Sequence, residues 1–249
     1  MLSDKHILFL DGVLMKSDFL KGTADGIPIA LGYLSVSFGF GIMAAGAGLS
    51  VFEAFMISLT NLTSAGQAQG VSIIASGGTL FEMAVVQFII NIRYALMAIS
   101  LSQKLDESFT LPKRLLGAYG ITDEIFAVCS ASKGSLKPKY MYGVILVSTV
   151  GWVLGTFLGA AAGEILPSSV TAALGIVLYG MFIAIIIPPS RKEKSVLFVV
   201  LTAAALSCIC KYFIPTISGG FAVILCALIS SLMGAIFFPK KYDKEDENK

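Results

Sequence analysis

The segment from Phe81 to Ser102 constrains this chain most strongly, because it places an arginine inside a stretch that is long enough to cross a bilayer. About 20 apolar residues span the hydrocarbon core as a helix, and the sequence NIRY at 91–94 lies near the middle of the segment. An arginine at mid-membrane depth costs roughly 2.5–3.5 kcal/mol on insertion scales. Arg93 therefore needs a partner, water or a substrate facing it.

The composition agrees with a membrane protein and excludes several other classes. Hydrophobic residues make up 56% of the chain and charged residues 14%, against about 25% charged in soluble domains. This balance predicts an all-α polytopic membrane protein. The net charge of +2 provides no basic field for nucleic acid. Because the single histidine and the four cysteines have no zinc-ligand spacing and no nucleophile motif is present, we expect no metal site, no cofactor and no enzyme.

The hydrophobic segments predict one helical bundle at 24–238, between a cytoplasmic leader at 1–23 and a charged cytoplasmic tail at 239–249. We expect about seven to eight segments, at 27–48, 52–76, 81–102, 115–131, 140–163, 170–187, 196–213 and 219–238. In the first, Pro28 is expected in the opening helical turn, where its missing N–H is harmless.

Two of these segments have features of broken or re-entrant helices. The segment at about 52–76 contains TSAGQAQG at 63–70, and the short segment at about 115–131 contains TDE at 122–124. Backbone can leave a helix at membrane depth only where protein or water satisfies it, and such breaks often form transporter sites. A continuous small-residue helix is the alternative for the first of them.

A row of glycines, at 151, 155, 159 and 163, has a spacing of four residues. On a helix this spacing aligns the glycines on one face and lets another backbone approach closely. We predict a packing face there, within the chain or with a partner subunit.

The basic residues predict the orientation. All except Arg93 and Lys211 lie in five hydrophilic stretches, at 5–21, 104–114, 133–139, 191–194 and 240–249. If 52–76 and 115–131 are re-entrant, all five stretches lie on one side, whereas eight simple spans would place 104–114 on the other. Both arrangements put the N- and C-termini in the cytoplasm by the positive-inside rule.

The polar residues of the three unusual segments form the predicted substrate site. Arg93 has the geometry to grip a carboxylate with two hydrogen bonds, and Asp123 or Glu124 can hold an ammonium group. Adjacent helical residues point about 100° apart, so we expect only one of the two to face Arg93. A structural salt bridge without substrate contact is the alternative. The other predicted site residues are Ser64, Gly66, Gln67, Gln69, Asn91, Tyr94 and Thr122.

The same motifs, taken in order, resemble the AzlC family of branched-chain amino acid permeases. The resemblance covers about residues 20–238 and rests on GIPIALGYLSVSFGFG at 26–41, SAGQAQG at 64–70, NIRY at 91–94 and TDEIFA at 122–127. Tyr94 stands where the family usually has histidine, which removes the side chain that a histidine-dependent proton step would use.

The resemblance implies a subunit of a secondary transporter that exports branched-chain or similar small amino acids, with or without proton coupling. It also implies a multi-pass location in the lipid bilayer of the bacterial cytoplasmic membrane and a small AzlD-like membrane subunit as partner. Two other classes stay open from the residues alone. One is a passive channel for a small solute or ion, and the other is a membrane scaffold whose partner carries the activity.

Overall fold

The computed structural model describes residues 2–167, 169–170, 180, 183 and 186–239. Within these residues the regular elements are all helices: α1 (Leu2–Gly46), α2 (Val51–Thr60), α3 (Ala65–Ala75), α4 (Leu80–Ser102), α5 (Leu111–Tyr119), α6 (Asp123–Ala131), α7 (Pro138–Ile165), α9 (Lys194–Phe213) and α10 (Gly219–Phe237). Five are long and apolar enough to cross a bilayer, namely α1 from Asp18 onward, α4, α7, α9 and α10. The predicted all-α polytopic membrane protein is confirmed. The predicted segment at 170–187 and the tail at 239–249 lie largely outside the described residues.

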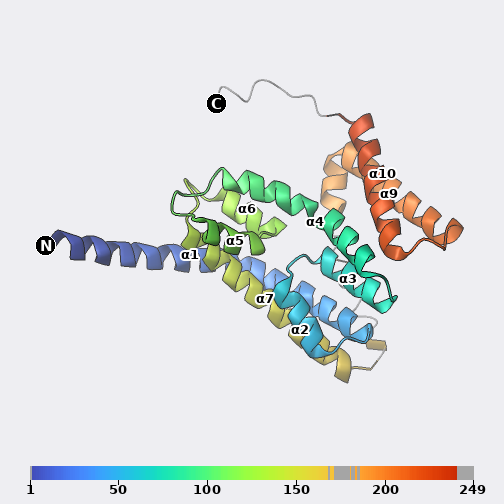
Figure 1. Cartoon of the computed structure of the whole chain (residues 1–249), viewed down its shortest axis with the longest axis horizontal. Helices are drawn as coiled ribbons and strands as arrows, with labels where there is room; N and C mark the ends of the chain where they lie inside the picture. Colours follow the sequence, from blue (N-terminus) through green and yellow to red (C-terminus); the bar gives the residue numbers. More distant parts are fainter. Residues whose placement is uncertain (1, 168, 171–179, 181–182, 184–185, 240–249) are drawn as a thin grey trace.

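Helices α1 and α7 form a parallel pair that is the centre of the molecule (Figure 1). Their N-terminal ends lie together, because Lys137 Nζ is 3.0 Å from Asp18 Oδ2 and the Tyr140 hydroxyl donates to Asp25 Oδ2 at 2.7 Å. We call this the Lys137 end of the bundle. The opposite end, where α1 finishes, is called the Gly46 end.

The glycine row of α7 explains why this pair is so close. A Cβ built at Gly151, Gly155 or Gly159 would collide with backbone atoms of α1. Further along, a Cβ at Gly163 would lie 2.8 Å from the Ala45 side chain. Small residues give this proximity in membrane helices, where van der Waals contact replaces the hydrophobic effect as the driving force. The predicted packing face is confirmed, and its partner is α1 of the same chain.

Helices α2 and α3 form a re-entrant hairpin that enters and leaves at the Gly46 end. Ala54 of α2 and Val71 of α3 belong to one buried cluster with Phe40 and Ala44, near the end of α1. The tip of the hairpin is the non-helical stretch 61–64, where buried Leu62 joins the other core cluster, around Trp152. The predicted break is confirmed, although helix resumes at Ala65, within the stretch where we had placed it.

Helices α5 and α6 form a second hairpin, which enters and leaves at the Lys137 end. Its base is closed by a backbone pairing between Leu105 and Leu136, and the Lys104 ammonium donates to the carbonyl of Ser130 at the C-terminus of α6. Its tip is the stretch 120–122, where Ile121 is buried in the same cluster as Leu62. The two tips meet from opposite directions.

This arrangement brings the basic stretches at 104–114 and 133–139 to the same end of the bundle. Helix α4 begins at the Gly46 end and finishes at the Lys137 end, beside Leu136. The threading with two re-entrant hairpins therefore describes α1 to α7. That the Lys137 end faces the cytoplasm stays a prediction from the positive-inside rule.

Proline 28 differs from its expected position. Helix α1 is continuous from Leu2 to Gly46, so Pro28 lies inside it and not in a first turn. The predicted leader at 1–23 thus continues into the spanning helix without a break. Interior prolines are tolerated in membrane helices because neighbouring helices and local adjustments satisfy the freed backbone groups.

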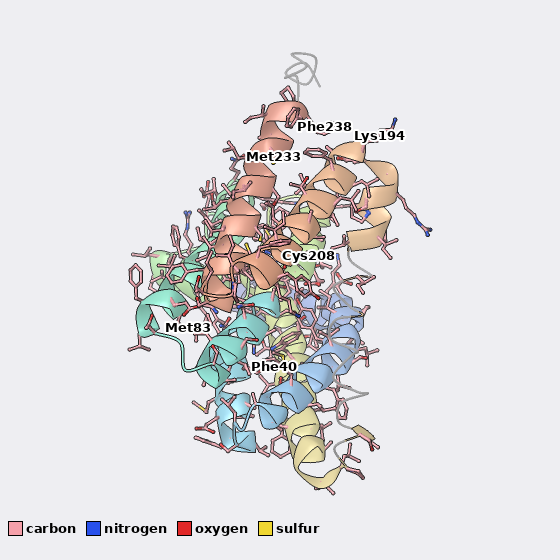
Figure 2. The ribbon with its side chains drawn as sticks, turned by 90° about the vertical axis from the view of Figure 1, so that its right-hand side faces the viewer. Phe40, Met83, Lys194, Cys208, Met233 and Phe238 are labelled. Carbon is pink, nitrogen blue, oxygen red and sulfur yellow. The ribbon has the colours of Figure 1, made fainter. Side chains whose placement is uncertain are left out.

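Helices α9 and α10 form an antiparallel pair, and α10 packs against α4 and α3 (Figure 1). Figure 2 shows Lys194, at the start of α9, and Phe238, just after α10, at the same end of the pair. At the other end, the buried Glu82 carboxylate of α4 accepts hydrogen bonds from the Ser218 hydroxyl and from the Gly220 N–H, at 3.1 Å for the latter. The burial of Glu82 is possible because the N-terminus of α10 stabilises the carboxylate.

Candidate functional site

A cavity of about 620 Å³ lies where the two hairpin tips meet, against α1, α4 and α7. Its charged groups come from the start of α6 and the middle of α4, and further polar groups come from the start of α3, from α1 and from α7. Most of its surface is apolar. The lining residues are Pro28, Ile29, Gly32, Tyr33, Val36, Leu62, Ser64, Ala65, Ile90, Arg93, Tyr94, Thr122, Asp123, Glu124 and Trp152.

Arg93 and Asp123 form an ion pair in the wall of the cavity. Arg93 Nη1 is 2.7 Å from Asp123 Oδ2, and about half of each side chain is exposed. The guanidinium also lies over the Tyr94 ring, 4.9 Å from its centroid, and Nη2 donates to the Tyr94 hydroxyl at 3.2 Å. The prediction that residues 122–124 supply the partner of Arg93 is confirmed. Half-exposed charges at this depth require water or a polar ligand beside them.

Glu124 has a different environment from its neighbour Asp123. Its Oε2 lies 2.6 Å from the hydroxyl of Tyr33, and that hydroxyl lies 2.6 Å from Thr122 Oγ1. Among the described residues, Glu124 has no lysine or arginine within ion-pair distance. As expected from helical geometry, one carboxylate faces the arginine and the other faces away, toward α1.

A buried polar chain connects this site to the α2–α3 hairpin. The Tyr33 ring packs edge-on against Trp152, with ring centroids 5.2 Å apart. The Trp152 indole N–H donates to Gln67 Oε1 at 3.0 Å, and Gln67 Nε2 donates to Ser58 Oγ at 2.9 Å. Thr156 Oγ1 then lies 2.7 Å from Ser58 Oγ. These bonds satisfy groups that would be costly to bury alone, and they fix the first hairpin against α7.

The N-terminus of α3 opens onto the cavity. Ser64 precedes it with φ +47°, an uncommon conformation for a residue other than glycine. Its side chain makes no capping hydrogen bond, and the first turn of α3 contains no acidic residue. A helix N-terminus of this kind carries partial positive charge and free N–H groups.

The predicted site residues divide into two groups. Six of them line the cavity together: Ser64, Arg93, Tyr94, Thr122, Asp123 and Glu124. The other four do not. Gln67 is buried and bound to Trp152 and Ser58, while the Gly66 carbonyl accepts from Gln87 Nε2 at 2.8 Å. Asn91 donates to Gln87 Oε1 at 3.0 Å, and Gln69 is partly buried along α3.

Sequence reasoning did not single out Tyr33 and Trp152. Both are aromatic residues in long apolar segments, where a pattern of ordinary core packing hides a polar role. The signal in the sequence that could have found them is that each carries a hydrogen-bonding group inside a membrane segment, where that group needs a partner. Within the described part of the chain, no group of three histidine, cysteine or acidic side chains is arranged to hold a metal ion.

Fold and site together define a helical membrane protein whose cavity, mostly apolar but with charged groups of both signs, lies between two opposed re-entrant hairpins. This construction is typical of transporters. The family model described as AzlC protein matches residues 28–166, from α1 to the end of α7. The chain belongs to the AzlC family.

Known relatives are membrane proteins from bacteria and an archaeon. Inner membrane protein YgaZ of Escherichia coli K12 is 28% identical over 226 residues, which cover 88% of this chain and 91% of YgaZ. An uncharacterized membrane protein of Archaeoglobus fulgidus is 33% identical over 172 residues, 68% of this chain and 75% of the relative. No solved structure matches the chain.

Proposed function

We propose that this chain is the transporting subunit of a secondary exporter of branched-chain or similar small amino acids, in a bacterial cytoplasmic membrane. The cavity at the hairpin tips is the observation that carries the proposal. It combines charged groups of both signs with a mostly apolar lining. A zwitterionic amino acid with an aliphatic side chain has the same combination of groups.

The substrate carboxylate binds between Arg93 and the N-terminus of α3. Arg93 offers several N–H donors, its side chain is about half exposed, and it lines the cavity. Ser64 and Ala65 line the same cavity at the start of α3, where no acidic side chain opposes an incoming anion. The carboxylate therefore competes with Asp123 for Arg93.

The substrate ammonium binds to the acidic start of α6. Asp123 and Glu124 both line the cavity there. When the carboxylate of the substrate engages Arg93, Asp123 becomes available for the ammonium. This exchange makes the salt bridge part of the transport cycle, so the structural and the substrate-binding roles of Arg93 are compatible.

Proton coupling, if the exporter uses it, runs through Glu124. Asp123 is paired with Arg93, at 2.7 Å, whereas the hydrogen bond that Glu124 accepts among the described residues comes from the hydroxyl of Tyr33. The titratable groups around it are Asp123, Arg93 and Tyr94, besides Tyr33. A Glu124→Gln variant should export at a rate that no longer varies with pH, measured as initial efflux between pH 5.5 and 8. Unchanged pH dependence would place the proton elsewhere.

The proposed partner is a small AzlD-like membrane subunit. Family resemblance suggests it, and the half-exposed Arg93–Asp123 pair is compatible with a cavity that is completed by water or by a second chain. The direction of transport, outward, also comes from the resemblance.

The test is efflux of labelled leucine, isoleucine and valine from preloaded cells, with and without the small subunit. Arg93→Gln should abolish efflux, while Arg191→Gln, the same change at an exposed position shortly before α9, should not. Counterflow with unlabelled amino acid outside separates a carrier from a passive channel. No efflux of any of the three amino acids from properly inserted protein would overturn the proposal.

A further inference from the structure

Glycine 32 has an unusual position on α1. It lines the cavity, and among the described residues no side chain and no neighbouring helix comes within 4 Å of a Cβ built on it. Other glycines of the same helix are in close contact with α7. A Cβ at Gly22 or Gly41 would collide with α7 backbone, and one at Gly26 would lie 2.6 Å from Val147. Helix packing therefore requires glycine at those positions but not at 32.

Backbone conformation does not require glycine at this position either. Gly32 lies in the middle of a continuous helix and has no positive φ. In such a position glycine destabilises the helix by roughly 0.5–1 kcal/mol relative to alanine. Within the described part of the chain, neither a close helix nor a turn explains why this position has no side chain. The missing side chain at Gly32 leaves open space in the cavity.

That space lies on the apolar side of the cavity. Ile29, Gly32 and Val36 are spaced three and four residues apart, which places them on one face of α1, and all three line the cavity. Gly32 thus forms a gap between two aliphatic side chains. The charged groups come from other helices, Arg93 from α4 and Asp123 from α6.

We infer that Gly32 determines the size of the aliphatic side chain that the site accepts, and that the gap beside it receives a side chain as large as that of leucine. This inference rests on the proposed function, since it assigns a part of the same cavity. Ile29 and Val36 flank the side chain of the substrate, and its zwitterionic head lies toward Arg93. Filling the gap with a methyl or isopropyl group excludes large substrates and leaves room for small ones.

The experiment compares efflux of leucine with efflux of alanine, in the full chain co-expressed with the small subunit. Gly32→Val should lower the leucine-to-alanine ratio by about 10-fold or more, because one methylene in an apolar pocket is worth 10–200-fold in discrimination. Gly32→Ala should lower it less. The KM for leucine should rise while the maximal rate for alanine is kept.

The matched control is Gly46→Ala. Gly46 is also a helical glycine of α1 with no atom within 4 Å of a Cβ, but it does not line the cavity. Its substitution should leave the ratio unchanged. The melting temperature of Gly32→Ala should equal or exceed that of the wild type, because alanine favours the helix.

Two results would overturn the inference while the proposed function stands. One is an unchanged leucine-to-alanine ratio in Gly32→Val, and the other is an equal loss for both amino acids. Wild-type protein that is inserted and exports neither amino acid would instead refute the proposed function itself, and the inference with it.

Discussion

The two re-entrant hairpins are alike in construction but differ in the charge at the start of their second helix. Each is a helix of about three turns, a short break and a second helix. The end of each break has a similar sequence. It is Leu62-Thr63-Ser64 in the first hairpin and Ile121-Thr122-Asp123 in the second. In both, the aliphatic residue is buried in the same cluster. They enter from opposite ends of the bundle, so their second helices both begin at the cavity.

The difference lies in how these second helices begin. Helix α6 has a capping hydrogen bond from the Ile125 N–H to Thr122 Oγ1, and its first turn carries Asp123 and Glu124. Helix α3 has neither a side-chain cap nor an acid, and Ser64 has a positive φ. One helix start therefore attracts a cation and the other an anion. Under the proposed function, the two ends of a zwitterion are divided between two similar hairpins.

The largest expected effect on transport comes from removing the negative charge of Asp123 at the start of α6. Asp123→Asn leaves Arg93 without its ionic partner and should lower leucine efflux by about 100-fold, as misplacement of a binding group can. Ser64→Ala, at the matching position of the other hairpin, removes one neutral hydroxyl. It should raise the free-energy barrier to leucine efflux by about 1 kcal/mol or less. Initial rates normalised to inserted protein measure both. Equal losses would show that the hairpins are not specialised in this way.

The next effect concerns the tip of the α2–α3 hairpin. A Cβ at Gly66 would collide with the Thr63 side chain and lie 2.7 Å from Gln87 Oε1. Gly66→Ala should therefore destabilise the protein by about 1–3 kcal/mol, the usual cost of overpacking. Gly70→Ala is the control on the same helix, because its Cβ would have an ordinary contact of 3.4 Å. Thermal unfolding of purified protein that shows the same loss for both would contradict the packing described for Gly66.

A smaller effect tests the contact between the two hairpins. The Tyr119 hydroxyl of α5 donates to the carbonyl of Leu59, near the end of α2. Tyr119→Phe should lower the unfolding free energy by about 1 kcal/mol and slow efflux. In Tyr142→Phe, the lost bond is to the Lys113 carbonyl and does not reach the other hairpin. We expect Tyr142→Phe to transport normally. Slow transport in that variant would show that the effect of Tyr119→Phe does not come from the contact between the hairpins.

The smallest expected effect is on stability, and substitutions in the two breaks should change it in opposite directions. Ser64→Gly relieves a strain of about 1 kcal/mol, and the entropy of glycine offsets about 0.5–1 kcal/mol of the gain. A slight rise in melting temperature is expected. Thr122 has an ordinary φ of −120° and caps α6, so Thr122→Ala should lower stability by about 1 kcal/mol. A fall in stability for Ser64→Gly would show that the positive φ carries no strain.

Both breaks and the pairing of Arg93 could be predicted because they leave local signs in the sequence. Small and polar residues at 63–70 and acids at 122–124 are conspicuous in apolar segments, and a charge at mid-depth requires a partner. The exact start of α3 was not predictable in the same way. Gly66 and Gly70 read as breaks but are helical, because α4 packs against them through Gln87 and Met83.

Other parts of the site depend on contacts between distant segments. Nothing near Tyr33 in the sequence indicates that its hydroxyl meets Glu124, 91 residues later. The burial of Glu82 depends on α10, which follows it by more than 130 residues. Gly32 lies in a helix in which Gly22, Gly26 and Gly41 serve packing, so only the three-dimensional surroundings distinguish it.

The parallel pairing of α1 and α7 has a consequence for how the protein is made. Helix α1 leaves the ribosome first, but the face that the α7 glycines contact has no partner until α2 to α6 have all been synthesised. Both breaks contain backbone groups that the bilayer core cannot satisfy, and the walls against which they pack include α7. The hairpins can therefore reach their final depth only after α7 has entered the membrane. We therefore expect the two hairpins to settle into the bundle together, once α7 has been inserted.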